Sequence, residues 1–119
     1  MKKHVRANKF GSDSIDFADA LAVKALNCAL LKHHYEIEGW NVPEGYLCPP
    51  IPGRVDYIHY AADLLANSGI KASDSRQVKM LDIGTGANGI YSLLAARVYG
   101  WHCSGSEIDP VGLKNLATV

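Results

Sequence analysis

A glycine-rich run in the second half of the chain constrains the fold more than any other feature. Residues 81–89 read Leu-Asp-Ile-Gly-Thr-Gly-Ala-Asn-Gly. The apolar segment 78–83 has the length of a short strand, and apolar residues recur at helical spacing from Ile90 to Val98. A strand that passes through a tight glycine turn into a helix is typical of a βαβ unit, which is right-handed and builds a parallel sheet. Residues 101–107 can form its second strand, and Pro110 suits the first turn of a further helix.

The first half of the chain has helical patterning. Its apolar spacing predicts one amphipathic helix over about 17–35, capped by Ser14 or Asp16, and another over about 55–68. Residues 49–53 read Pro-Pro-Ile-Pro-Gly, and three prolines fix φ and remove amide donors. We therefore expect neither a helix nor an inner strand over residues 49–53.

The predicted fold class is α/β, with N-terminal helices followed by the first βαβ unit of a Rossmann-like sheet. The pattern changes near residue 77, which divides the chain into a helical and proline-rich segment, 1–77, and the start of a Rossmann-like domain, 78–119. Two strands leave the edge of a parallel sheet unpaired. The sequence is therefore expected to be the N-terminal part of a longer protein, either a fragment or a truncated product, and to be incomplete and inactive alone.

Composition excludes several classes of protein. Twelve basic and twelve acidic side chains balance, so only a local patch could attract a polyanion. The three cysteines form no Cys-x-x-Cys pair and the histidines have no ligand spacing, which predicts reduced thiols and no metal site. No apolar stretch has the length of a membrane helix, and we expect a cytoplasmic protein that does not bind membranes. The basic residues of the first ten positions are either an arm that touches phosphates or a solvated terminus.

The glycine turn predicts a nucleoside-containing ligand. Gly84 and Gly86 allow the backbone to approach a ligand, and the helix behind them presents free amides. Glu107 follows Gly84 by 23 residues, close to the roughly 20-residue spacing of an acidic residue that accepts hydrogen bonds from a ribose diol. Asp109 is a rival for that role.

Asp82 separates two possible cofactors. The pattern Gly84-x-Gly86-x-x-Gly89 also fits an NAD-binding Rossmann protein, in which the strand normally stays apolar up to the first glycine. Here a carboxylate stands two residues earlier, where it can face a cationic group of the ligand. S-adenosylmethionine has an ammonium group and no pyrophosphate, so these residues favour S-adenosylmethionine over NAD.

Four longer segments resemble the 23S rRNA adenine-N6 methyltransferase F family and its eukaryotic U6 snRNA relatives, which are class I methyltransferases. These are residues 14–18, 23–27, 47–60 and 81–91, of which the proline-rich segment joined to Arg-Val-Asp-Tyr-Ile-His is the most specific. The resemblance implies methyl transfer from S-adenosylmethionine to the exocyclic amine of an RNA adenine, with 23S rRNA as the substrate.

The resemblance also assigns roles to single residues. It implies that Gly84 and Asn88 contact the cofactor, that Glu107 holds its ribose, and that Arg54 reaches the cofactor site from the proline-rich segment. A guanidinium can pair with a methionine carboxylate through two hydrogen bonds, which agrees with that role for Arg54.

The adenine-binding motif of such enzymes does not occur in this sequence. Adenine-N6 enzymes of this class carry an Asn-Pro-Pro-Phe type run that holds the flipped base, and the only Pro-Pro pair here follows Cys48, upstream of the glycine turn. The catalytic residues are therefore not identified. A third interpretation, besides the methyltransferase and the NAD-binding protein, is a non-catalytic RNA-binding or scaffold remnant.

Overall fold

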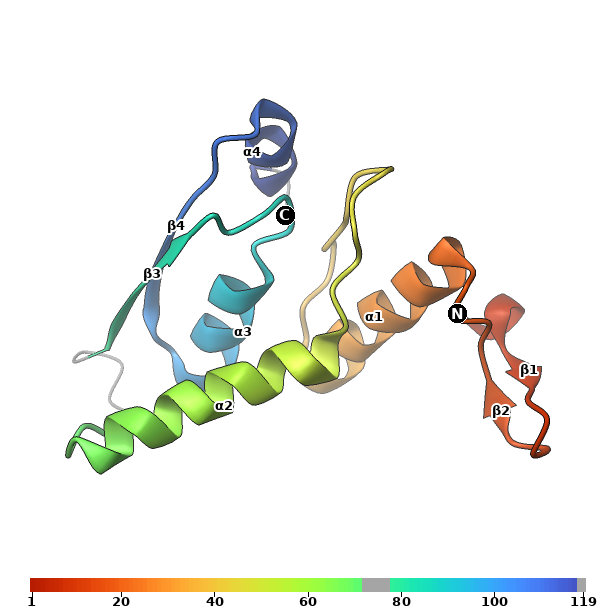
Figure 1. Cartoon of the computed structure of the whole chain (residues 1–119), viewed down its shortest axis with the longest axis horizontal. Coiled ribbons are helices and arrows are strands. Elements are labelled where there is room, and N and C mark those ends of the chain that lie inside the picture. Colours follow the sequence, from red (N-terminus) through yellow and green to blue (C-terminus); the bar gives the residue numbers. More distant parts are fainter. Residues whose placement is uncertain (72–77, 118–119) are drawn as a thin grey trace.

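The computed structural model describes residues 1–71 and 78–117. Short elements come first: a 3-10 helix η1 (Lys2–His4) and the antiparallel strands β1 (Arg6–Ala7) and β2 (Asp13–Ser14). The main elements follow in the order α1 (Ala20–Tyr35), α2 (Ile51–Asn67), β3 (Lys79–Ile83), α3 (Ile90–Tyr99), β4 (His102–Ser106) and α4 (Pro110–Leu116). Figure 1 shows the β1–β2 hairpin standing apart from the other elements.

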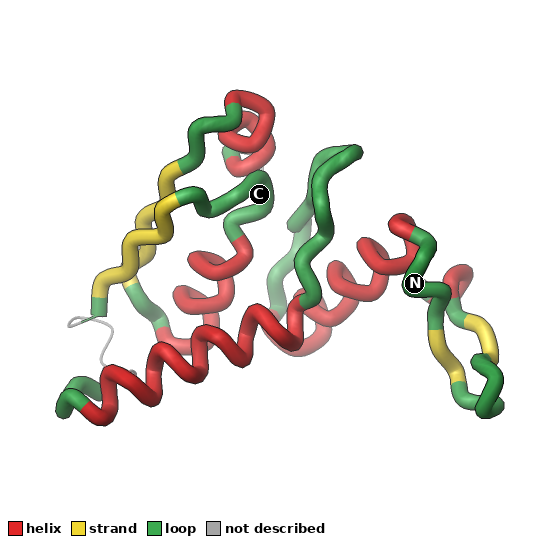
Figure 2. Tube along the Cα trace, viewed as in Figure 1, coloured by secondary structure: helices red, strands yellow, loops and turns green. Residues whose placement is uncertain are grey.

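The predicted βαβ unit is confirmed. β3 pairs in parallel with β4, in a register that runs from Lys79 opposite His102 to Ile83 opposite Ser106, and α3 connects the two strands. α3 packs against both strands and also against α1 and α2. The tube view in Figure 2 shows α3 between the two-stranded sheet and the long helix α2. The α/β fold class predicted from the sequence is therefore correct.

The prediction for the proline-rich stretch is wrong at its C-terminal end. α2 begins at Ile51, so Pro52 and Gly53 are helical. Proline is tolerated there because the first amides of a helix have no partner within it. The amide of Ile51 instead donates to Oδ1 of Asn27 on α1, at 2.9 Å.

The predicted start of the first helix is also wrong. The helix begins at Ala20, and its cap is Asp19, whose side chain accepts from the amides of Leu21 at 3.0 Å and Ala22 at 3.4 Å. Asp16 closes the preceding turn by accepting from the amide of Ala18. Several acceptors near the start of a helix compete for the cap, and spacing does not distinguish them.

One apolar core joins the helices to the sheet. Its buried members come from α1, α2 and the loop between them, from α3, and from Val78 and Trp101, which precede β3 and β4. Leu31, Ile51, Ile58 and Leu94 are the largest fully buried side chains. The core fixes the position of the N-terminus of α2 relative to the glycine turn, and those two segments form the candidate site.

We expect an Asn27→Ala variant to be less stable than the parent protein by roughly 1 to 3 kcal/mol. Asn27 is 4% exposed and joins α1 to α2, because its amide nitrogen donates to the carbonyl of Val23 while its oxygen caps Ile51. Removing the side chain leaves the Ile51 amide buried without that acceptor. Urea unfolding followed by circular dichroism measures the change, with the exposed Asn67→Ala as control; equal stability of the two variants would contradict the capping role.

Candidate cofactor site

The glycine turn has the backbone conformation that its sequence requires. Gly84 and Gly86 have φ of 72° and 78°, in the left-handed region that disfavours other residues. The amide of Thr85, between them, donates to the carbonyl of Ser106 at 2.8 Å. The end of β3 is thereby tied to the end of β4, and the turn opens on the carboxyl edge of the sheet, where ligands of α/β folds bind.

A cavity of about 370 Å³ lies at this edge. Residues from three segments line it: the end of the α1–α2 loop, the first turns of α2, and the stretch from the end of β3 to the start of α3. They are Leu47, Pro49, Arg54, Asp82, Ile83, Gly84, Thr85, Asn88, Ile90 and Tyr91. Four of the six residues proposed from sequence as cofactor contacts, Arg54, Asp82, Gly84 and Asn88, thus share one cavity.

The cavity carries opposite charges on two of its walls. Oδ2 of Asp82 is buried and has no hydrogen-bond partner among the described residues. The guanidinium of Arg54 lies over the ring of Tyr91, with 5.7 Å between Cζ and the ring centroid. A buried carboxylate oxygen without a partner is costly, which suggests that a ligand supplies the missing donor.

Asn88 and Glu107 both bond to the backbone. Oδ1 of Asn88 accepts from the amide of Ile90 at 3.1 Å, at the start of α3. Oε2 of Glu107 accepts from the amide of Gly86 at 2.8 Å, and its Oε1 accepts from the amides of Ile108 at 3.0 Å and Asp109 at 3.2 Å. Within the described chain, Gly86 and Glu107 are not among the residues that line the cavity. Glu107 fixes the glycine turn, and a ribose contact remains a prediction.

Tyr46 makes a side-chain contact that the sequence does not predict. Its hydroxyl donates to Oδ2 of Asp109, the residue that caps α4, and this hydrogen bond raises the pKa of Tyr46 above its ordinary value. The contact ties the α1–α2 loop to the segment after β4. No sequence signal marks it, because the two residues are 63 positions apart.

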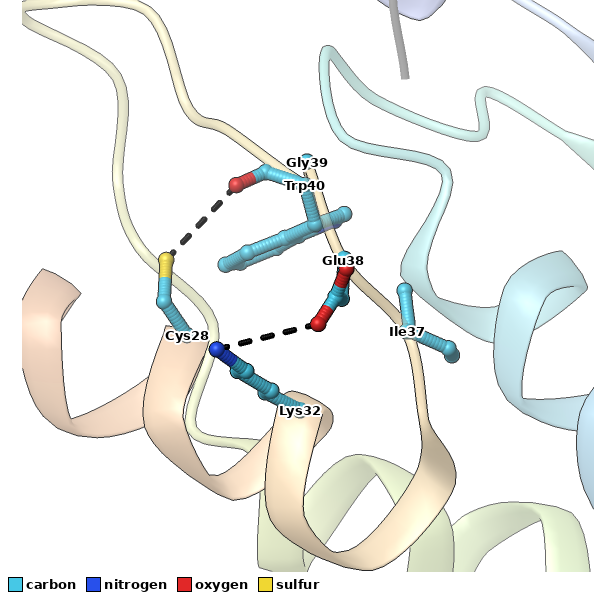
Figure 3. A pocket seen from close by; sticks show the side chains of 6 residues that line it. All are labelled: Cys28, Lys32, Ile37, Glu38, Gly39 and Trp40. Atoms are coloured by element: carbon cyan, nitrogen blue, oxygen red, sulfur yellow. Dashed lines mark hydrogen bonds and ion pairs between the residues drawn. The ribbon is translucent and has the colours of Figure 1, made fainter.

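A second cavity, of about 310 Å³, lies between α1 and the segment that follows it (Figure 3). Cys28, Lys32, Ile37, Glu38, Gly39 and Trp40 line it. The thiol of Cys28 donates to the carbonyl of Trp40 at 3.6 Å, and burial raises the pKa of this thiol, which keeps its proton in place. Lys32 and Glu38 form an exposed ion pair at 3.7 Å.

The cysteines, the possible metal ligands and the helices bear on the predictions about thiols, metals and membranes. All three cysteines are free and half-buried. Within residues 1–71 and 78–117, no three His, Cys, Asp or Glu side chains gather as a metal site would require. None of the helices described has both the length and the apolar character needed to span a bilayer.

Comparison with known proteins identifies relatives along the whole chain. Residues 1–119 match a protein family described as RNA methyltransferase. The ribosomal RNA large subunit methyltransferase F of Shewanella frigidimarina is 59% identical over 115 residues, which are 97% of this chain and 32% of that protein. The protein of the same name from Saccharophagus degradans is 54% identical, over 98% of this chain and 39% of its own length. The chain thus spans about a third of the curated relatives that it matches.

Solved structures agree with this comparison. The N-terminal domain of human METTL16 in complex with SAH superposes with a TM-score of 0.86 at 35% identity, over 98% of this chain and 44% of that one. The hMettl16 catalytic domain in complex with the MAT2A 3'UTR hairpin 6 gives 0.83 at 34% identity, over 98% of this chain and 38% of that one. The described elements are therefore part of a methyltransferase fold, which is larger than the segment present here.

Proposed function

Because the chain belongs to an RNA methyltransferase family, we propose that it provides the cofactor-binding part of an S-adenosylmethionine-dependent enzyme that methylates N6 of an adenine in 23S rRNA. The observation that carries the cofactor assignment is the cavity that the guanidinium of Arg54 and the carboxylate of Asp82 line together. The cytoplasm is the location that we propose for this activity.

The residues present fit S-adenosylmethionine by charge. The amino-acid end of this cofactor carries a carboxylate and an ammonium group, and the cavity offers one cation and one anion. Arg54 would take the carboxylate through two hydrogen bonds, and Oδ2 of Asp82 would accept from a cationic group. Gly84, Gly86 and Asn88 would let the rest of the ligand approach the turn closely, and Glu107 would accept from the ribose.

The same charges disfavour NAD. A pyrophosphate at the glycine turn needs free amides and no nearby negative charge. Here the carboxylate of Asp82 lines the cavity, and the amide of Gly86 already donates to Glu107. Two negative groups close together in a partly buried site repel each other, so dinucleotide binding would lose affinity.

The protein's contribution to the reaction is positioning. When bound, S-adenosylmethionine supplies a methyl group on a sulfonium, which is a good leaving group. The chain would hold the amino-acid end of the cofactor at Arg54 and Asp82 and exclude water with Leu47 and Pro49. Correct placement of two reactants accounts for much of the rate in such a transfer.

The adenine specificity rests on the family resemblance alone, while a hairpin-bound relative supports RNA as the class of substrate. One similar structure holds the hMettl16 catalytic domain in complex with the MAT2A 3'UTR hairpin 6. The Asn-Pro-Pro-Phe type motif that would hold the target amine does not occur in the 119 residues of this sequence. We therefore assign the base-binding residues to the part of the relatives that this chain does not span.

Calorimetry with S-adenosylmethionine, S-adenosylhomocysteine and NAD tests the cofactor. We expect saturable heat with the first two ligands and none with NAD; saturable NAD binding alone would reject the proposal. Protein-free 23S rRNA, incubated with labelled S-adenosylmethionine and digested to nucleosides, tests the substrate. Because the base-binding residues are assigned outside this chain, we expect its 119 residues alone to give no label, and label in N6-methyladenosine only when they are joined to the rest of a methyltransferase domain. Cofactor binding without label in any nucleoside in that joined protein would favour the non-catalytic remnant.

We expect Arg54→Ala to weaken S-adenosylmethionine binding by roughly 1 to 3 kcal/mol, because hydrogen bonds to a charged group are lost. Arg54→Lys keeps the charge but loses the planar pair of donors, so it should recover only part of the affinity. Calorimetry below the unfolding temperature of each variant gives the dissociation constants. Arg6→Ala, in the hairpin, is the control; an unchanged constant for Arg54→Ala would remove Arg54 from the site.

A further inference from the structure

Two side chains from distant segments bind the backbone of the glycine turn. The indole nitrogen of Trp40 donates to the carbonyl of Asn88 at 3.0 Å. The side-chain amide of Asn115 on α4 donates to the carbonyl of Ala87 at 2.6 Å and to that of Asn41 at 3.1 Å. The carbonyls of two consecutive turn residues are thus each held from outside the βαβ unit.

α1 holds the segment that carries Trp40. The carbonyl of Trp40 accepts from the thiol of Cys28, as Figure 3 shows, and the carbonyl of Val42 accepts from the ammonium group of Lys24 at 3.1 Å. The Trp40 side chain itself is 5% exposed and belongs to the core. The indole is therefore fixed both through its backbone and through its ring before it reaches Asn88.

These contacts orient the peptide units of the turn. In a trans peptide the carbonyl and the following amide point in opposite directions. Holding the carbonyls of Ala87 and Asn88 therefore also sets the directions of the amides of Asn88 and Gly89, away from Asn115 and Trp40. Asn88 lines the 370 Å³ cavity, so the orientation of its peptide units bears on what that cavity can bind.

We propose that Trp40 and Asn115 are positioning residues that hold the glycine turn in its cofactor-binding conformation. The inference rests on the proposed function for its consequence in cofactor affinity, but its structural part can be tested without any ligand. Neither residue lines the cavity, and each acts through a backbone carbonyl of the turn. A preformed turn loses less freedom on binding, which improves affinity.

Amide hydrogen exchange in the ligand-free protein is the first measurement. We expect Trp40→Phe, which keeps an aromatic ring in the core but removes the indole N–H, to speed exchange at residues 87–90 by about fivefold, the effect of one lost hydrogen bond. Trp101→Phe is the matched control, because Trp101 is also 5% exposed and packs on Tyr99. Equal exchange at residues 87–90 in the two variants would overturn the proposal.

Calorimetry with S-adenosylmethionine is the second measurement. Trp40→Phe and Asn115→Ala should each raise the dissociation constant about fivefold, while Trp101→Phe and the exposed Asn67→Ala leave it unchanged. Should Trp40→Phe fail to fold, Asn115→Ala decides the question by the same two measurements. If the parent protein does not bind S-adenosylmethionine, the proposed function fails, and hydrogen exchange still accepts or rejects the positioning role.

Discussion

An Asp82→Asn variant is expected to bind S-adenosylmethionine about 2 to 5 kcal/mol more weakly than the parent protein, the cost of truncating one partner of a buried charge pair. Oδ2 of Asp82 is buried at the cavity and has no hydrogen-bond partner among the described residues, so a cationic ligand group would be its first partner. Asparagine keeps the shape of the side chain and removes its charge. The loss therefore reports on charge recognition and little on packing.

The same variant is expected to be more stable in the absence of ligand. Asp82 as a residue is half-buried, but its Oδ2 is buried without a hydrogen-bond partner among the described residues, and neutralising the carboxylate should raise the free energy of unfolding by about 1 kcal/mol. A substitution that raises stability and lowers affinity indicates a residue kept for function, because natural sites often retain unfavourable groups that only the ligand satisfies.

Two measurements test the expected loss of affinity and the expected gain in stability. Calorimetry gives the dissociation constant for S-adenosylmethionine, and urea unfolding gives the stability of the free protein. Asp63→Asn, on the exposed part of α2, is the control and should change neither quantity by more than about 0.5 kcal/mol. Unchanged affinity in Asp82→Asn would show that the cavity does not recognise a cation, and would withdraw the argument against NAD.

The βαβ unit could be predicted because its signal is local. The apolar strand, the glycines and the helical spacing after them lie within one continuous stretch, and each favours the same structure. The start of α2 could not be predicted in this way. Its first amide is capped by Asn27, which lies 24 positions away on another helix, and nothing in the local sequence of the prolines shows that contact.

The sequence could indicate the site residues that act through a distinctive side chain. Asp82 was indicated by its own charge and Arg54 by the family resemblance, and both line one cavity. Trp40 and Asn115 could not be assigned, because their acceptors are backbone carbonyls, which every residue has. The contacts of Glu107 with three backbone amides escaped prediction for the same reason.

A Leu94→Ala variant is expected to unfold with about 2 to 5 kcal/mol less free energy than the parent protein. Leu94 is 0% exposed, and its helix, α3, packs against α1, α2, β3 and β4. Truncation removes apolar contacts and leaves a cavity that the surrounding elements can fill only by moving. Leu64→Ala, which truncates a leucine 69% exposed on α2, is the control and should cost far less.

The stability lost in Leu94→Ala should be measurable in both segments of the chain, 1–77 and 78–119. The core contains Leu31 and Ile58 from the first segment together with Leu94 and Trp101 from the second, so neither segment buries its apolar face alone. The two tryptophans, Trp40 and Trp101, stand one in each segment, and Trp40→Phe and Trp101→Phe backgrounds leave one reporter at a time. Each Leu94→Ala double variant is compared with its own single-tryptophan background, and we expect the urea midpoint to fall by the same amount in both, because a shared core makes unfolding cooperative. A shift of the Trp101 transition alone would instead show that residues 1–77 fold as an independent unit.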